Sequence, residues 1–351
     1  SSPVAAFSHH LVSRDGVMDI YLHAPGGAVQ VSGGGFGPQT IQSVAIPAQD
    51  QNYIRSIVNL LDSVIDLDFN FVGDPSQSDV AFYYDQEINL VGAGQTLGLA
   101  TPGLAGWELF VNYPAVANDL DYRQYVNLHE WGHSLGLEHP FEASDGDVFD
   151  SNTDPWSSAY PEQTVMAYRT PLTGNWPDFF TTQDLNALIE IWGAETQLLD
   201  STNNTFTGGS YRDVISGLGG DDRLIGANGN DQINGNDGAD LVLGSLGNDE
   251  LFGGSGNDVL RGGKGDDWLT GGAGDDEISG DLGSDRIRVS KGNDLILGFS
   301  VNEGDRLELA SGVSFSLAAI DGSVQIQTML GVTTIVGISD LAAVNSAISL
   351  V

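Results

Sequence analysis

The segment Gly253–Ser279 reads GGSGNDVLR, GGKGDDWLT and GGAGDDEIS, three consecutive copies of one nine-residue pattern. Each copy has glycine at its first, second and fourth positions, aspartate at its sixth and an apolar residue at its eighth. Glycine permits the left-handed backbone that a tight turn needs, and the residues around the apolar position form a very short strand. The pattern therefore predicts one turn and one strand per copy.

The repeat extends well beyond these three copies, and a flexible glycine-rich linker would not keep its apolar position. Ten aspartates stand nine residues apart, each followed two places later by an apolar residue: Asp213, Asp222, Asp231, Asp240, Asp249, Asp258, Asp267, Asp276, Asp285 and Asp294. Two copies make one coil of a parallel β-roll, so these aspartates stack and are expected to bind several structural calcium ions. Without calcium the stacked carboxylates repel, and the segment should be disordered.

Composition excludes several classes of partner. The 351 residues include 48 acidic and only 12 basic side chains, a net charge of −36 that argues against nucleic acid and anionic membranes. The chain has no cysteine, so it has neither disulfides nor thiolate metal sites. No apolar run approaches the roughly 18–20 residues that span a bilayer, so we expect no membrane insertion.

A second motif lies in the first half, where His129–Pro140 reads HEWGHSLGLEHP. On a helix, His129 and His133 are four residues apart and present their imidazoles on the same side. Gly136 can adopt a left-handed conformation that ends this helix. The chain can then reverse direction and bring His139 back as a third ligand. Three imidazoles with one open position indicate a single catalytic zinc ion, with Glu130 as the general base beside it.

The rest of the first half predicts helices and a mixed sheet. Apolar periodicity indicates a helix in 49–65, a helix from Asp119 or Asp121 to Leu135, and a third that begins near Thr181 and Asp184 and stops at Gly193. Strands are expected at Val17–His23, Leu67–Phe71, Val80–Tyr84, Gln95–Thr101 and Trp107–Tyr113, and the rest of 1–45 is expected to be irregular. The acidic segment 141–165 is either a solvated loop or a further calcium site.

These features predict an α+β catalytic domain in 1–200, with a mixed twisted sheet and helices. A parallel β-roll with capping strands is expected in 201–351.

The zinc motif resembles that of the metzincins, and the whole chain resembles serralysin, the secreted bacterial metalloprotease family with a calcium-binding roll. The segment Thr164-Val165-Met166-Ala167-Tyr168 is similar to the family's Met-turn. The resemblance implies that Met166 underlies the zinc ligands. It also implies that Tyr168 is a catalytic residue and a fifth zinc ligand that swings to stabilise the oxyanion.

The same resemblance implies a monomeric zinc endopeptidase that acts on extracellular proteins and peptides, with Gln95–Thr101 as the strand that pairs with substrate. The apolar C-terminus, Ile348–Val351, is similar to the family's export signal, so we expect type I secretion. Phe141 replaces a glycine that is common in the family, which leaves the side-chain preference open. Two alternatives remain: a calcium-dependent adhesive or surface protein with an idle protease-like domain, and a polysaccharide enzyme that shares only the repeat.

Overall fold

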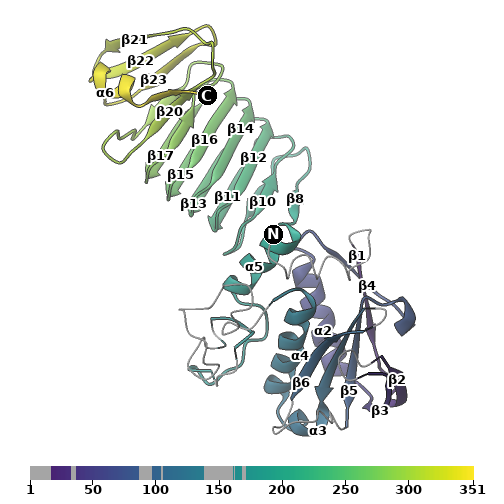
Figure 1. Ribbon diagram of the computed structural model, residues 1–351. Helices are drawn as coiled ribbons and strands as arrows, with labels where there is room; N and C mark the ends of the chain where they lie inside the picture. The colour runs from purple at the N-terminus through teal and green to yellow at the C-terminus, as the bar shows by residue number, and fades with distance from the viewer. Residues whose placement is uncertain are drawn as a thin grey trace. The chain divides into compact units, whose positions relative to one another are not determined.

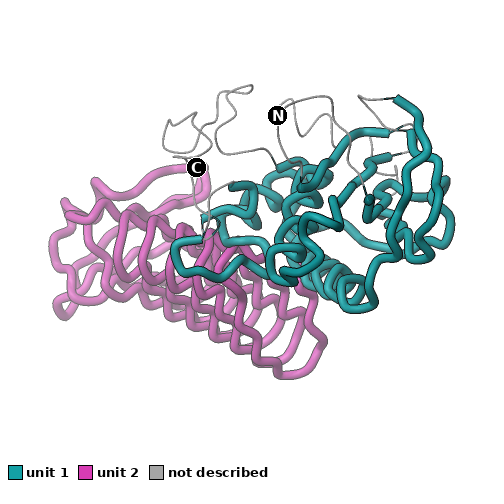
Figure 2. The backbone as a smooth tube through the Cα atoms, turned by 90° about the horizontal axis from the view of Figure 1, so that it is seen from below, with its two compact units in different colours: residues 1–195 teal, residues 196–351 magenta. Residues whose placement is uncertain are grey.

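The computed structural model describes residues 17–32, 37–86, 97–103, 106–137, 161, 163–167 and 171–351. The chain divides into two compact units, Ser1–Glu195 and Thr196–Val351 (Figures 1 and 2). The boundary falls shortly after the end of helix α5 (Thr182–Trp192). Within the described part of the chain, no helix combines the length and the apolar character that crossing a membrane requires.

The first unit is built on one seven-stranded mixed sheet. Its strands are β1 (Val17–Leu22), β2 (Gly27–Val31), β3 (Gln39–Val44), β4 (Asp68–Phe71), β5 (Val80–Asp85), β6 (Gly98–Pro102) and β7 (Trp107–Asn112). Strand β5 lies in the middle, with β1 and β7 parallel to it and β4 parallel to β1. The β2–β3 hairpin joins antiparallel at the end of β5, and β6 lies antiparallel on β7.

Two long helices cover one face of this sheet (Figure 1). The helices of the unit are α2 (Ala48–Leu61), the 3-10 helix η2 (Pro75–Gln77), α3 (Tyr113–Val116), α4 (Leu120–Ser134) and α5. Phe82 and Tyr84 of β5 point to the same face because side chains alternate along a strand. The Phe82 ring packs edge-on against Trp131 of α4 at 5.6 Å, and the Tyr84 hydroxyl donates to Asp50 of α2 at 2.9 Å. The contact with β5 therefore fixes the position of α4, the helix that carries the histidine motif, on the sheet.

The expected helices and strands of this unit are present, and one expectation is wrong. The Thr181–Asp184 capping box forms, and α5 ends at Gly193 with φ of 95°. Residues 27–44, expected to be irregular, form the β2–β3 hairpin. Its strands are short and flanked by glycine, so their alternation of apolar and polar residues is too brief to be recognised in the sequence. The hairpin forms because Val31 and Ile41 pack on the second face of the sheet.

The second unit is a parallel β-roll, as the repeat predicts. Its coil strands are β8 (Thr196–Leu198), β9 (Thr205–Thr207), β10 (Val214–Ser216), β11 (Arg223–Asn228), β12 (Gln232–Asp237), β13 (Leu241–Leu246), β14 (Glu250–Ser255), β15 (Val259–Lys264), β16 (Trp268–Ala273), β17 (Glu277–Leu282), β18 (Arg286–Arg288), β19 (Leu295–Leu297) and β20 (Arg306–Leu309). Even-numbered strands form one sheet and odd-numbered strands the other. Each pairs in parallel with the strand two places on, as Leu224 does with Val242, so one coil takes two repeats.

One apolar side chain per repeat fills the space between the two sheets. These residues are at most 2% exposed: Ile215, Leu224, Ile233, Val242, Leu251, Leu260, Leu269, Ile278, Ile287 and Ile296. Burying each of them stabilises the roll by about 1.5–3 kcal/mol. The apolar core is therefore one residue wide per repeat.

The C-terminal residues cap the roll. They form β21 (Phe315–Ile320), β22 (Ser323–Thr328), β23 (Val332–Ile335), α6 (Leu341–Ser346) and β24 (Ile348–Leu350). Strand β23 continues the odd sheet in parallel with β19, and β24 continues the even sheet in parallel with β20. Strands β21 and β22 then turn the odd sheet antiparallel, which ends the repeat geometry.

We predict that Gly256→Ala destabilises the roll more than Gly337→Ala. Both glycines have a left-handed φ, 133° and 83°, so both substitutions carry the strain of a side chain in that region. A Cβ on Gly256 would also overlap the carbonyl oxygen of Gly238, whereas none of the surroundings lies within 4 Å of one on Gly337. Urea unfolding in calcium should show an extra loss of about 1–3 kcal/mol for Gly256→Ala. Equal losses would contradict this packing.

Candidate active site and metal-binding residues

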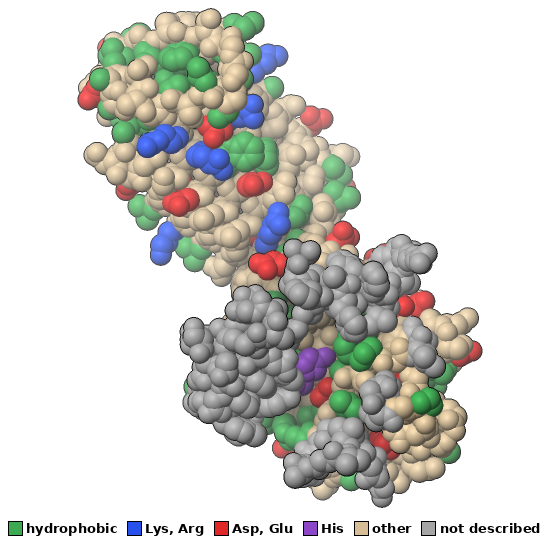
Figure 3. Space-filling model, viewed as in Figure 1, with side chains coloured by type: hydrophobic (Ala, Val, Ile, Leu, Met, Phe, Trp, Pro, Cys, Tyr) green, Lys and Arg blue, Asp and Glu red, His purple; other side chains and the backbone are tan. Residues whose placement is uncertain are grey.

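Helix α4 presents the first two histidines of the motif on one side. Asp119 caps its N-terminus by accepting a hydrogen bond from the Tyr122 N–H at 3.0 Å. The His129 and His133 rings lie 5.2 Å apart between centroids and are nearly perpendicular. His129 is buried and His133 half-buried, and Figure 3 shows histidine and acidic side chains next to each other on the visible face of this unit.

Backbone carbonyls hold both rings through the same nitrogen. His129 Nδ1 donates to the Val165 carbonyl at 2.8 Å, and His133 Nδ1 donates to the Leu137 carbonyl at 3.0 Å. A carbonyl can only accept, so each neutral ring carries its proton on Nδ1 and its lone pair on Nε2. This is the tautomer and the second-shell hydrogen bond that metal-binding histidines use. The donor set therefore fits a zinc ion.

The end of α4 has the geometry that the motif predicts. Gly136 has φ of 102°, and the Leu137 N–H returns to the Gly132 carbonyl at 2.9 Å, so the chain reverses direction here. The proposed third ligand, His139, and the proposed fifth, Tyr168, both lie outside the described residues, as does most of the acidic segment 141–165. Among the described residues, no three His, Asp or Glu side chains converge on one point.

Met166 lies directly against the metal-binding helix. It is 1% exposed, and a Cβ on Gly132 would lie 2.6 Å from its sulfur. Gly132 stands between the two histidines in the sequence, so the thioether packs against the helix backbone at this point. The sequence alone marks Met166 only through the family resemblance, because a single buried methionine carries no functional signal of its own.

Asp184 connects the turn that contains Met166 to α5, a role that sequence reasoning missed. Its carboxylate accepts hydrogen bonds from the Thr164 hydroxyl at 2.5 Å and the Val165 N–H at 3.0 Å. It also accepts from the Thr181 N–H at 2.9 Å, which completes the capping box. The capping pattern predicts the contact with Thr181, but only the fold brings Thr164 and Val165 to the same carboxylate.

Glu130 points toward strand β6. It is 7% exposed, and burial raises its pKa to about 8, although a hydrogen bond from the Ala100 backbone lowers it in part. A Cβ on Gly98 would overlap the Glu130 carboxylate, so the glycine leaves the room that this side chain occupies. Gly98 is a second site residue that sequence reasoning missed, because nothing in its local pattern points to α4.

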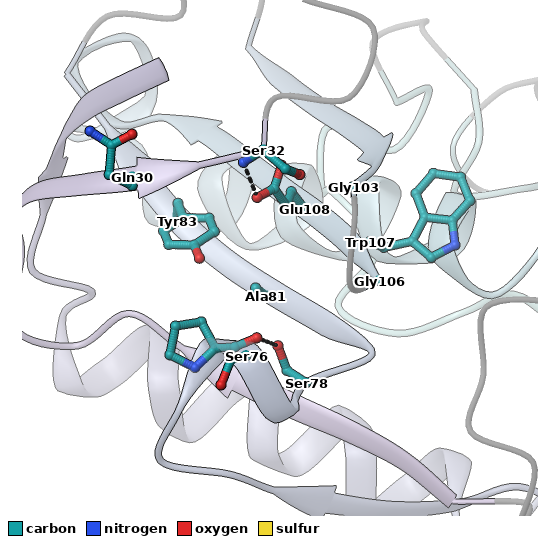
Figure 4. Close-up of a pocket in the computed structure, with 11 residues that line it drawn as sticks. Gln30, Ser32, Ser76, Ser78, Ala81, Tyr83, Gly103, Gly106, Trp107 and Glu108 are labelled. Carbon is teal, nitrogen blue, oxygen red and sulfur yellow. Dashed lines mark hydrogen bonds between the residues drawn. The ribbon is translucent and has the colours of Figure 1, made fainter. Parts of the chain in front are cut away.

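A separate cavity of about 200 Å³ lies on the other face of the sheet (Figure 4). Its lining includes Tyr83, which alternates with Phe82 and Tyr84 and so points away from α4. The Glu108 carboxylate there accepts hydrogen bonds from the Ser32 N–H at 2.8 Å and hydroxyl at 2.9 Å. This cavity is therefore distinct from the histidine site.

In the roll, the stacked aspartates use one carboxylate oxygen to hold the coil together. From Asp231 to Asp294, the Oδ1 atom of each accepts the N–H of the aspartate 18 residues earlier, as in Asp222 to Asp240 at 2.8 Å and Asp231 to Asp249 at 2.8 Å. The predicted stacking is thus confirmed. The series gains one member after a two-residue insertion, because Asp305 accepts the N–H of Asp285 at 3.1 Å. The strict nine-residue count missed Asp305.

The second oxygen of most of these carboxylates is buried and accepts no hydrogen bond from the described residues. This holds for Oδ2 of Asp222, Asp231, Asp240, Asp249, Asp258, Asp267, Asp276 and Asp285. A Cβ on Gly244 would overlap Asp249 Oδ2 and would lie 2.7 Å from the Gly262 carbonyl oxygen. The glycine positions thus bring a carboxylate oxygen and a carbonyl oxygen together, the hard oxygen ligands that calcium prefers.

Without a cation this arrangement is electrostatically costly. Burial, together with neighbouring aspartates of the stack, raises the pKa of Asp258 and Asp267 to about 7. Burial also raises the pKa of Asp276 and Asp285 to about 6. Bound calcium would remove this cost by supplying positive charge next to these carboxylates.

Comparison with known proteins identifies the second unit. The family model of the RTX calcium-binding nonapeptide repeat (4 copies) matches residues 200–233, 216–251, 234–269, 252–287 and 279–300. Residues 200–300 are therefore RTX repeats, which bind calcium structurally. No curated protein matches the chain.

Two solved structures are similar to this chain in part. The extracellular lipase LipA from Serratia marcescens is 18% identical over 45% of this chain, with a TM-score of 0.23, and the match spans 40% of the lipase. The AlgE6R3 subunit of a mannuronan C5-epimerase from Azotobacter vinelandii is 18% identical over 42% of this chain and 78% of its own, with a TM-score of 0.19. Neither likeness bears on what the first unit does.

We predict that calcium removal unfolds the roll. In excess EGTA the β signal of residues 196–309 in far-UV circular dichroism should disappear, because the stacked carboxylates then face each other without a cation. Calcium at about 0.1–1 mM should restore it, as in other extracellular calcium modules. A roll that keeps its β signal in EGTA would contradict the assignment.

Proposed function

We propose that this protein is a zinc-dependent endopeptidase of the serralysin-like metzincin type, secreted and active on extracellular proteins and peptides. The observation that carries the proposal is the pair of imidazoles on α4, each oriented by a backbone carbonyl through Nδ1. Two further residues support the proposal: Glu130 is buried on the same helix, and Met166 packs against that helix. His139 is proposed to complete the zinc ligands, and Tyr168 to act as the fifth, switching ligand.

When bound, zinc supplies a Lewis acid that lowers the pKa of water and polarises the scissile carbonyl. Glu130 moves the proton: its carboxylate takes one from the attacking water and delivers it to the leaving amide nitrogen. Strand β6 orients the substrate, because among the described strands it pairs only with β7 and so offers its other edge to an extended peptide. Its proximity to Glu130 would place a peptide bound at this edge beside the general base.

The calcium dependence of the roll bears on where the protein folds and acts. RTX repeats that fold only with calcium would remain unfolded until the chain meets millimolar calcium outside the cell. We therefore propose type I secretion, an extracellular location and a monomeric enzyme whose roll matures after export. Zinc is proposed as the catalytic ion, one per chain, beside the structural calcium of the repeats.

Substitution of the general base tests the mechanism. Glu130→Ala should lower casein hydrolysis by about 10²–10⁴-fold because the variant lacks the carboxylate that moves the proton, while zinc still binds. His133→Ala should abolish both zinc binding and hydrolysis. Glu190→Ala, which removes an exposed acid from α5, should leave hydrolysis unchanged.

Wild-type hydrolysis by Glu130→Ala would refute the mechanism. A zinc-loaded wild-type protein that cleaves no peptide but binds cells or polysaccharide would favour the adhesive alternative.

A second test concerns the space beside Glu130. Gly98→Ala should reduce kcat by roughly ten-fold or more, because the added methyl group must displace the carboxylate, and a 1 Å misplacement can cost about 10²-fold. Gly73→Ala is the matched control, since a Cβ there meets no atom within 4 Å. Peptide-cleavage kinetics of both variants should separate them, and equal kcat values would show that this contact is unimportant.

A further inference from the structure

The backbone N–H and carbonyl of Val165 are held by side chains from different helices. Its N–H donates to Asp184 of α5 at 3.0 Å. Its carbonyl accepts from His129 Nδ1 at 2.8 Å and lies 2.9 Å from the Tyr125 hydroxyl, and both of these residues belong to α4. A carbonyl oxygen has two lone pairs, so it can serve both donors.

Tyr125 also reaches the next carbonyl beyond Met166. Its hydroxyl lies 2.6 Å from the Ala167 oxygen, so the single proton of one buried hydroxyl is shared between the carbonyls on either side of the methionine. Tyr125 stands one helical turn before His129, and the two rings are 6.1 Å apart between centroids. The side chain is 4% exposed, so water does not replace the hydroxyl in this role.

We propose that Tyr125 is a positioning residue for the metal site, which acts through the Val165 carbonyl to orient His129, with Asp184 as a second anchor that holds the N–H of the same residue. The inference rests on the proposed metal centre. The Met166 turn, residues 164–167, can orient His129 only if its carbonyl is itself fixed. Loss of the Tyr125 hydroxyl removes a contact that fixes the Val165 carbonyl, while Asp184 still holds only the Val165 N–H, and the His129 ring can then rotate away from the ligand geometry.

A role confined to packing would involve the ring and not the hydroxyl. The Tyr125 and Tyr122 rings each lie 4.6 Å from the Trp176 ring, so both tyrosines share the same aromatic contact. Of these two tyrosines, Tyr125 alone hydrogen-bonds the Met166 turn in the described structure. Tyr122→Phe is therefore a matched control, which removes a hydroxyl from the same aromatic cluster.

The test measures zinc affinity of the full chain in calcium, by competition with a zinc-binding dye. Tyr125→Phe should raise the zinc Kd by roughly ten-fold, in the range that loss of a second-shell partner causes, whereas Tyr122→Phe should match wild type. Asp184→Asn, which exchanges one acceptor oxygen for a donor, should also weaken zinc binding. Thermal unfolding of the metal-free variants reports their intrinsic stability separately.

A purely structural role would lower the stability of metal-free and zinc-loaded Tyr125→Phe equally and leave the zinc Kd unchanged, and that result would overturn the proposal. If Tyr125→Phe does not fold, the Kd of Asp184→Asn decides. A wild-type chain that binds zinc but cleaves no peptide would refute the peptidase and leave the positioning role intact. Absence of zinc binding by wild type would refute both.

Discussion

The hydrogen bond from the N–H of one aspartate to the carboxylate of the aspartate 18 residues later sets the geometry of the roll. From Asp213 to Asp294 it fixes one coil at two repeats, because each bond joins aspartates 18 residues apart. It also leaves the second carboxylate oxygen facing the glycine turn, buried beside a carbonyl of the next coil. The same side chain thus joins the coils through one oxygen and creates a need for calcium through the other.

Stability in the two units has different sources. In the roll, the apolar core is one side chain wide per repeat, so its folding is coupled to cation binding. The first unit has a layered core. On one face of the sheet β5 packs against α2 and α4, and on the other face its side chains pack with side chains of the β2–β3 hairpin. A folded roll and a folded first unit are therefore expected to respond differently to calcium removal.

The candidate site depends on contacts between segments that are distant in the chain. Helix α4 supplies His129, Glu130 and His133, but their surroundings come from Val165, Asp184 and strand β6. Trp192 of α5 adds a further tie, since its ring N–H donates to the Leu135 carbonyl at 2.9 Å, close to the end of α4. Both ends of α5 thus hold the elements that surround the histidine pair.

Local pattern alone determined much of this protein. The repeat, the spacing of the histidines and Gly136 each specify backbone geometry within a few residues, so the roll, helix α4 and its end could be predicted from sequence. Tertiary structure decided the β2–β3 hairpin, the place of Gly98 beside Glu130 and the second role of Asp184, because those depend on which surfaces meet. A sequence records the period of a strand or a helix. The contacts of the Asp184 carboxylate with Val165, and of the Tyr125 hydroxyl with two carbonyls, form only when separate elements pack together.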